Sequence, residues 1–292
     1  MALLQEQTVR ADVPRIRVTR DLVKRIVVFL LLLGIVLLFV VPIIWMVLTS
    51  FQPETQIFNP SAGWIPVHWM WSNYVKALEY FPYLLYLKNT LTITVPATAG
   101  IVVSSAFVAY GLSHLKWRGQ NAVFYVVLSH MVIPVWVTII PLYIIFSHIH
   151  WINTYWPLIV PHLFGSAFSV FLYRQFFLKQ PTAVLDAARI DGASELRIFA
   201  QIVMPMAQPA ILVVTLLNFV WTWTDFFGPL VFLNDPNKYT LMLGLAVFEG
   251  KHLTLWPELM AANVMVIAPV LLIFALAQRQ FIEGINLTGT VG

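Results

Sequence analysis

The chain has 292 residues, of which 60% are hydrophobic and only 10% are charged, and its mean hydropathy is +0.81. Soluble domains carry about 25% charged residues, so this composition excludes an ordinary water-soluble fold. The absence of cysteine excludes disulfides, thiolate catalysis and cysteine-ligated zinc, and we attribute the net charge of +4 to basic residues that face the cytoplasm and not to nucleic-acid binding.

Six apolar runs, each long enough or nearly so to cross a bilayer, follow one another along the chain. About 25 polar and basic residues precede the first run and no small-residue cleavage site follows it, so we expect a retained anchor and not a signal peptide. The predicted fold class is therefore an all-α integral membrane protein with six transmembrane helices, between an N-terminal tail of residues 1–25 and a C-terminal tail of residues 284–292. The six runs span residues 26–48, 89–112, 122–146, 155–173, 206–232 and 259–277.

The placement of Lys and Arg predicts the orientation of these spans. Thirteen of the 17 basic residues fall in the N-terminal tail, the second and fourth connections and the C-terminal end. Because basic residues are enriched on the cytoplasmic side of membrane proteins, both termini of this multi-pass chain are predicted to be cytoplasmic. The two long outside connections are then residues 52–86 and 233–258.

Seven prolines lie inside the runs, and each removes a backbone donor and tends to bend its helix. Kinked helices suit a cavity that opens and closes, but proline is also common in membrane helices that do not move. The seven are Pro42, Pro96, Pro134, Pro141, Pro161, Pro229 and Pro269.

The connection between the fourth and fifth runs is too charged to span a bilayer and too apolar to remain free in water. Its sequence predicts two short helices. Thr182 is expected to cap the first, Asp191-Gly192 to form the turn, and Ser194 to cap the second, at whose positive end Glu195 is favourable. Pro205 is expected to end the segment. Either this is an amphipathic helix that lies on the membrane or on its own bundle, or it docks another protein in the cytoplasm.

The same connection resembles the EAA loop of binding-protein-dependent ABC importer permeases. That pattern is Glu-Ala-Ala, three residues, Gly, nine residues, then Ile-x-Leu-Pro. Here Asp186-Ala187-Ala188 is followed at the same spacings by Gly192 and by Ile202-Val203-Met204-Pro205. Asp186 replaces Glu and Met204 replaces Leu, so the charge is kept on a shorter side chain.

The resemblance implies that residues 176–204 form a coupling loop that sits in a cleft of a separate ATPase subunit. Asp186 would pair there with a basic residue, and Gly192 would set the bend. The residues that match or lie within the pattern are Asp186, Ala187, Ala188, Arg189, Asp191, Gly192 and Pro205.

Further stretches resemble the carbohydrate-importing branch of this family, and among its subunits the smaller permease of maltose-type importers. They include Trp71-Ser72-Asn73-Tyr74, Lys88-Asn89-Thr90, Met131–Pro134 with Pro141-Leu142-Tyr143, Asn218–Leu230 and Gln280–Gly284. The resemblance implies a type I ABC importer membrane domain over residues 26–283, with a shared core over about residues 88–281. It does not identify the sugar.

The resemblance also implies the partners: a homologous permease subunit, two ATPase subunits that bind ATP and Mg, and an external solute-binding protein that delivers a sugar or oligosaccharide. This chain would bind no cofactor and catalyse no reaction. Residues 234–256 are the candidate contact for the binding protein, and residues 284–292 are a candidate contact for the ATPase. The alternative is a secondary transporter or channel independent of ATP, which would show paired intramembrane charges or inverted repeats.

Three residues late in the fifth run are candidates for a substrate path or gate: Trp221, Trp223 and Asp225. Asp225 lies roughly 29 Å along a helix from Met206, near the outer surface, where it would be a hydrated interfacial acid or a residue of the sugar path. The two tryptophans would stack on a sugar ring or, as we favour, lie in the interfacial belt.

The sequence gives little indication of other chemistry. The pair His148 and His150 has no further ligand nearby and does not predict a metal site. Gly244…Gly250-Lys251-His252 has the wrong spacing for a phosphate loop and lacks Ser or Thr after the lysine. No Walker A, His-Glu-x-x-His or Gly-x-Ser-x-Gly motif is present, so energy is expected to come from another subunit.

Overall fold

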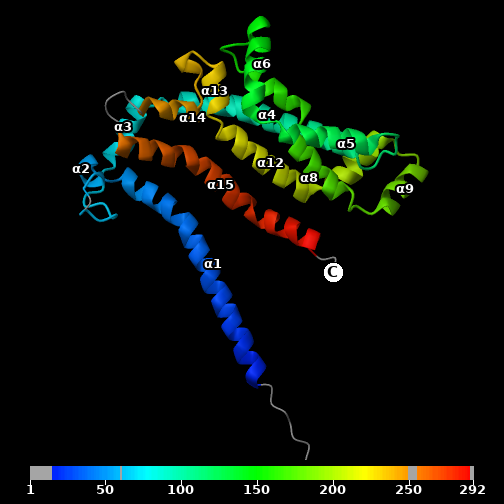
Figure 1. Ribbon diagram of the computed structural model, residues 1–292, viewed down its shortest axis with the longest axis horizontal. Coiled ribbons are helices and arrows are strands. Elements are labelled where there is room, and N and C mark those ends of the chain that lie inside the picture. The colour runs from blue at the N-terminus through cyan, green and yellow to red at the C-terminus, as the bar shows by residue number, and fades with distance from the viewer. Residues whose placement is uncertain (1–14, 60, 249–254, 290–292) are drawn as a thin grey trace, which may run out of the picture. The chain divides into compact units, whose positions relative to one another are not determined.

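A computed structural model describes residues 15–59, 61–248 and 255–289 (Figure 1). Side chains are described for residues 22–59, 61–246, 248 and 255–278. Within these residues the regular structure is helical and contains no strand, which confirms the predicted all-α class. The chain divides into two compact units, residues 1–70 and 71–292.

The first unit consists of one long helix and a short folded loop. Helix α1 (Arg15–Ser50) begins inside the predicted N-terminal tail and continues through Pro42 without a break. Side chains from Leu22 to Phe39 are exposed all round the helix, and their uniformly apolar character from residue 26 onward fits contact with lipid. After α1 comes the short helix α2 (Glu54–Ile57). The buried Gln56 amide then closes the loop by donating to the carbonyls of Gly63 and Ile65, each at 2.9 Å.

The second unit holds the remaining helices, among which α4, α12 and α15 run side by side (Figure 1). Short 3-10 helices (η1, η2, η4, η5) and one π-helical turn (η3) join them. The elements are α3 (Ser72–Tyr80), α4 (Tyr83–Gly111), α5 (Gln120–Ser129), η1 (His130–Val132), α6 (Val135–His148), α7 (Trp156–Ile159), η2 (Val160–Phe164), α8 (Ala167–Phe177), α9 (Thr182–Ile190), α10 (Glu195–Ile198), η3 (Phe199–Val203), α11 (Met204–Met206), α12 (Gln208–Trp223), α13 (Phe227–Phe232), η4 (Pro236–Lys238), α14 (Leu241–Gly244), η5 (Leu245–Phe248) and α15 (Trp256–Gly289).

Four helical segments are long and apolar enough to cross a membrane: residues 22–50, 83–111, 156–177 and 256–278. Two further pairs of helical segments are long and apolar enough when each pair is taken together, with a sharp bend between its members. These are residues 120–132 with 135–148, bent by 95°, and residues 195–206 with 208–223, bent by 80°. The six predicted runs correspond to these segments and pairs, with the fifth run falling on α12 and α13. We therefore treat residues 195–206 as part of the connection that precedes the fifth span.

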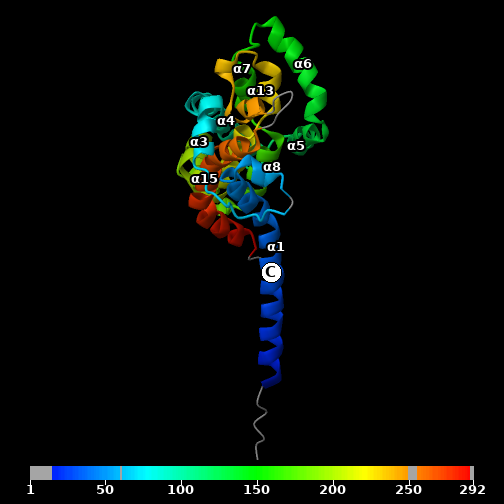
Figure 2. The same cartoon turned by 90° about the vertical axis from the view of Figure 1, so that its left-hand side faces the viewer.

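The sharp bend in the third span follows from Pro134. The residue before a proline is forced out of the helical region, and Ile133 has φ −78° and ψ 116°. The chain then restarts as α6, which Figure 2 shows as a helix separate from α5. Pro42, Pro96, Pro141 and Pro269 behave differently, because they lie inside continuous helices.

Helix α4 is the central element of the second unit and packs against α8, α12 and η2. Its buried face is built from small side chains such as Ala97, Ala106 and Ala109, all with no exposed surface. Small residues let helix backbones approach closely, which is how helices associate in lipid.

A few polar side chains join the helices inside the bundle. Asn218 Nδ2 donates to Ser169 Oγ at 3.0 Å and so links α12 to α8. Trp223 Nε1 donates to the Val266 carbonyl at 3.1 Å and links α12 to α15. In model membrane proteins such bonds each contribute about 0.6 kcal/mol.

The connections that were predicted to share a side of the membrane meet in space. Asn153, in the connection after α6, accepts the backbone N–H groups of Asn234 and Asp235 through its Oδ1, each at 3.1 Å. At the other end, Arg174 Nε donates to the Leu112 carbonyl at 2.8 Å and so joins the second connection to the end of α8. These contacts fit the predicted up-and-down order of the spans.

Parts of two predicted partner contacts lie outside the described residues. Within the candidate binding-protein contact 234–256, residues 249–254 are not described, and these include Gly250, Lys251 and His252. For the candidate C-terminal contact 284–292, α15 reaches Gly289, no side chain is described, and residues 290–292 lie beyond the description.

Candidate functional site

The connection between the fourth and fifth spans contains the two helices that the sequence predicts, with a turn at Gly192. Gly192 has φ +80°, its N–H donates to the Arg189 carbonyl, and the Ala193 N–H donates to the Ala188 carbonyl. These bonds form a Schellman turn, which satisfies the last carbonyls of α9. The predicted cap by Thr182 is wrong: Thr182 is the first helical residue, Pro181 takes the cap position, and there is no side-chain cap bond.

The second helix begins where Ser194 caps it, as predicted, by accepting the Arg197 N–H at 3.3 Å. It continues through the π-helical turn η3 and α11 to Met206, one residue beyond Pro205. The chain leaves helical geometry at Ala207 (φ −95°, ψ 11°) and turns by 80° into α12. From Glu195 to Met206 the connection is thus continuous helix up to the start of the fifth span.

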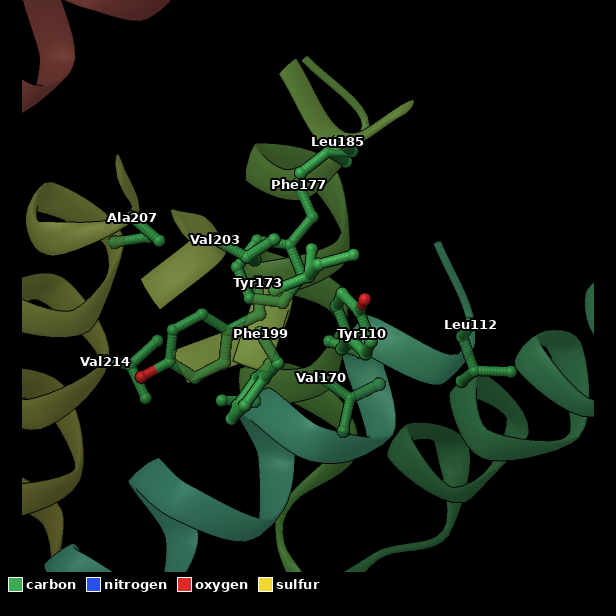
Figure 3. Close-up of a cluster of buried hydrophobic side chains, with 14 of the residues drawn as sticks. Tyr110, Leu112, Val170, Tyr173, Phe177, Leu185, Phe199, Val203, Ala207 and Val214 are labelled. Atoms are coloured by element: carbon green, nitrogen blue, oxygen red, sulfur yellow. The ribbon is translucent and has the colours of Figure 1, made fainter. Parts of the chain in front are cut away.

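One face of the loop is anchored in a cluster of buried side chains. Leu185 of α9 is only 1% exposed and packs in the same cluster as Phe177, Val203 and Tyr110 (Figure 3). Burying a leucine stabilises a fold by about 1.5–3 kcal/mol. This anchor fixes α9 against α8, the second helix of the loop and the end of α4.

The opposite face of the loop is exposed and largely apolar. Ile190 is 86% exposed and Leu196 is 65% exposed, and Val184 and Ala187 are exposed beside them. A large aliphatic side chain at a helix end gains nothing from water. Its presence on a firmly anchored loop indicates a surface that another molecule covers.

Arg189 connects the loop to itself and to α4. Its Nη1 donates to Asp186 Oδ1 at 2.9 Å, and its Nε donates to Glu195 Oε1 at 2.8 Å. The Tyr110 hydroxyl, at the end of α4, donates to the other oxygen of Glu195. We call Asp186, Arg189, Glu195 and Tyr110 the arginine clamp. Glu195 and then Asp186 raise the pKa of Arg189 above its usual range through these bonds.

A second set of polar groups holds the base of the loop. Gln180 Nε2 donates to the Val203 carbonyl at 3.1 Å, and His114 Nε2 lies 3.3 Å from Gln180 Oε1. Burial lowers the pKa of His114 from its ordinary value, an effect that the Gln180 hydrogen bond opposes. The neutral imidazole is therefore the form that fits this position.

The structure brings together the coupling-loop residues but not the three candidates of the fifth span. Asp186, Ala187 and Asp191 are exposed on the loop, and Ala188 and Arg189 are half-buried. Trp221 and Trp223 lie in the last turn of α12, at its far end from this loop, and Asp225 lies just beyond that end.

The two tryptophans of α12 differ. Trp221 is 52% exposed and its ring lies 5.5 Å from that of Phe168. Trp223 is only 2% exposed, so the preferred assignment of both tryptophans to the interfacial belt is wrong for Trp223, which packs inside the bundle. Asp225 is half-buried in the break between α12 and α13, where its Oδ1 accepts the Gly228 N–H at 3.0 Å.

Sequence reasoning missed the contribution of Tyr110 and His114 to this site. Both lie at the end of the second span, and their partners are 85 and 66 residues away. The available signal was topological: the second and fourth connections were predicted on the same side of the membrane. That prediction places these residues near the loop without selecting them.

Comparisons with known proteins match most of the chain. Residues 97–286 match the model of a family described as the binding-protein-dependent transport system inner membrane component. A probable ABC transporter permease protein of Pyrococcus horikoshii is 34% identical over 250 residues, which cover 84% of this chain and 90% of the relative. The diacetylchitobiose uptake system permease protein NgcG of Streptomyces coelicolor is 30% identical over 250 residues, covering 85% and 82%.

Among solved structures, a chain from a bacterial ABC transporter involved in the import of the acidic polysaccharide alginate has a TM-score of 0.77 and 23% identity. The match covers 90% of this chain and 98% of that one. At this identity the likeness shows the fold alone. It is the type I importer membrane fold that the sequence predicted.

Replacing Gly192 by alanine is expected to strain the turn without causing a clash. An added Cβ would meet no atom within 4 Å, so the cost of about 1–2 kcal/mol comes from the positive φ alone. Gly192→Asn should cost less, because asparagine tolerates this region better. Gly111→Ala is the matched control, since its Cβ also meets nothing and its φ is not positive. Thermal unfolding in detergent measures all three, and equal midpoints for Gly192→Ala and Gly111→Ala would contradict the strain.

Acidification is expected to destabilise the chain through His114. Since the pKa of His114 is lower in the folded chain, the unfolded chain binds the proton first, from about pH 6.5 downward, and stability falls as pH drops through the folded value. The unfolding midpoint should fall more steeply between pH 7.5 and 5.5 for the natural chain than for His114→Gln. Parallel pH profiles for the two proteins would show that His114 does not contribute.

Proposed function

Because the chain belongs to the family of binding-protein-dependent transport system inner membrane components, we propose that its α9 loop is the contact through which a separate ATPase subunit drives transport. The chain is a non-catalytic membrane permease subunit of the ABC transporter class. The observation that carries the proposal is the loop's two-sided construction. One side is anchored by Leu185, and the other exposes Val184, Ile190 and Leu196.

The charges of the loop give the chemistry of the partner surface. Arg189 is shared by two carboxylates, those of Asp186 and Glu195, so the clamp has a net charge of −1. Within the clamp, Asp186 is the carboxylate that a partner can reach more easily, because 62% of its side chain is exposed. An ATPase cleft that receives this loop would be apolar where Ile190 enters and would bring a Lys or Arg to Asp186.

The clamp also gives a route by which movement of the loop reaches the membrane helices. Through Glu195 and the Tyr110 hydroxyl, α9 is joined to the end of α4, the helix at the centre of the bundle. Through the continuous helix 195–206, it is joined to α12 across the 80° bend. A force on α9 would therefore act on two spans at once.

We further propose that the substrate is a sugar or oligosaccharide. Support comes from the diacetylchitobiose relative and from the fold shared with the alginate importer. In this proposal the chain sits in a bacterial inner membrane with both termini in the cytoplasm. It pairs with a homologous permease and with two ATPase subunits that use ATP and Mg. An external binding protein docks at residues 234–256, and Trp221 and Asp225 remain candidates for the substrate path.

Charge reversal at Asp186 tests the ATPase contact. When the chain is purified from its native membrane, an ATPase subunit should copurify, and binding-protein-stimulated ATP hydrolysis should be measurable. Asp186→Lys and Gly192→Pro should lose the ATPase subunit or at least 10-fold of the stimulation, as expected when one partner of a close charge pair is reversed. Glu79→Lys, at an exposed position of α3, is the control and should keep both the ATPase subunit and the stimulation. A natural chain that purifies alone and moves solute without ATP would instead support a secondary transporter.

Removing the Tyr110 hydroxyl tests the route to α4. Tyr110→Phe keeps the ring that packs edge-on against Phe199 at 5.2 Å but cannot bond Glu195. The ATPase subunit should still bind, while solute transported per ATP hydrolysed falls several-fold, and Glu195→Gln should behave similarly.

Tyr173→Phe is the matched control for this measurement, because the Tyr173 hydroxyl is buried without a hydrogen-bond partner. Its transport per ATP should stay unchanged. If Tyr110→Phe matches Tyr173→Phe in this ratio, the clamp does not transmit movement.

A further inference from the structure

A small polar cavity lies within the membrane bundle, apart from the coupling loop. Its volume of about 10 Å³ is close to the space that one water molecule requires. It lies between α4, α7 with η2, and the break between α12 and α13. The lining residues are Thr90, Ile93, Thr94, Leu158, His162, Thr222, Asp225, Pro229 and Thr240.

The Thr94 hydroxyl has no hydrogen-bond partner although the residue has no exposed surface. Threonines in helices usually bond the carbonyl four residues earlier, and two neighbours on α4 do so. Thr90 Oγ1 donates to the Tyr86 carbonyl and Thr92 Oγ1 to the Lys88 carbonyl, both at 2.8 Å. A hydroxyl that is buried and unpaired costs about 1–3 kcal/mol. The Thr94 hydroxyl therefore lacks a hydrogen-bond partner among the described residues, and a molecule bound in the cavity could provide one.

The Asp225 carboxylate lines the same cavity and has lone pairs that accept no hydrogen bond from the described residues. Its Oδ1 accepts the Gly228 N–H, but no Lys or Arg with a described side chain lies within ion-pair distance. Its Oδ2 lies so close to Gly228 that a Cβ there would approach it to 2.4 Å. Glycine at 228 thus lets the carboxylate fold over the start of α13. A carboxylate can accept about four hydrogen bonds, so acceptor sites remain open.

From these observations we propose that the cavity is a binding site for one water molecule, which accepts the Thr94 O–H and donates to the Asp225 carboxylate. Its second proton is available to a further acceptor on the wall, such as a neighbouring threonine oxygen. Buried waters make two to four hydrogen bonds, and this site offers them. His162 completes the polar wall on the η2 side.

The size and donor set of the cavity argue against other ligands. Ca²⁺ and Mg²⁺ need about six or more oxygen ligands, whereas this wall supplies one carboxylate, several hydroxyls and an imidazole. A sugar ring does not fit in about 10 Å³. In this conformation Asp225 is therefore a hydrated structural acid at a helix break, and the water links α4 to the α12–α13 break.

The sign of one substitution separates a hydrated cavity from a dry one. Thr94→Val keeps the shape of the side chain and removes only the hydroxyl. If a water is bound, the variant strips it of a partner, and the unfolding midpoint of the full-length protein should fall by about 2–4 °C. Thr94→Ser should retain the midpoint. Tyr173→Phe, which removes another buried unpaired hydroxyl remote from this cavity, should not lower it.

Direct detection of the water completes the test. Hydroxyl-radical footprinting of the full-length protein in ¹⁸O-labelled water should label residues at this cavity, and a high-resolution cryo-EM map should show one density between Thr94 and Asp225. A midpoint for Thr94→Val that is unchanged or raised, together with no label and no density, would overturn the proposal. Density that appears only in sodium-containing buffer would also overturn it, in favour of a cation.

Discussion

Hydrocarbon offers no water to backbone N–H and C=O groups, so every break in a membrane helix must find partners within the chain. The polar residues of this apolar chain meet that requirement at the breaks. The Asp225 carboxylate accepts the Gly228 N–H in the first turn of α13, and the Asn153 side-chain oxygen accepts the N–H groups of Asn234 and Asp235 after α13 ends. In the connection outside the spans, the Schellman turn at Gly192 likewise satisfies the last carbonyls of α9.

The loop of residues 176–204 has one side that is firmly packed and another side that is exposed to solvent. Leu185 packs its inner side in the cluster that includes α8, the arginine clamp joins it to α4, and the Gln180 amide ties the start of the loop to its own second helical part. Its outer side exposes aliphatic side chains and a partly neutralised carboxylate. A loop that was flexible throughout would deform when a partner displaced it, and a loop that was buried on both sides would have no surface for a partner to contact. This construction is what the proposed contact with an ATPase subunit requires.

Local signals in the sequence predict the features that depend on neighbouring residues. The apolar runs, the turn at Gly192 and the cap at Ser194 belong to this class. The right-angle break at Pro134 could not be separated from the continuous helix at Pro96, because packing around each proline decides between kinking and restarting. The clamp could not be predicted either, since Tyr110 and Glu195 are 85 residues apart. Trp223 was misplaced because it lies two residues from Trp221, on the opposite side of the helix.

Under the proposed function, sharing the Arg189 guanidinium between two carboxylates would make the affinity of the loop for the ATPase subunit depend on how α4 is held. A cation that approaches Asp186 competes with Arg189 for that carboxylate, and Arg189 is then free to bind Glu195 more fully. If binding of the proposed ATPase subunit changes the strength of the Glu195–Tyr110 contact, then by thermodynamic reciprocity a change in that contact changes the affinity for the ATPase subunit by the same factor. The conformation of the membrane helices would thus change the affinity with which the cytoplasmic ATPase subunit binds the loop.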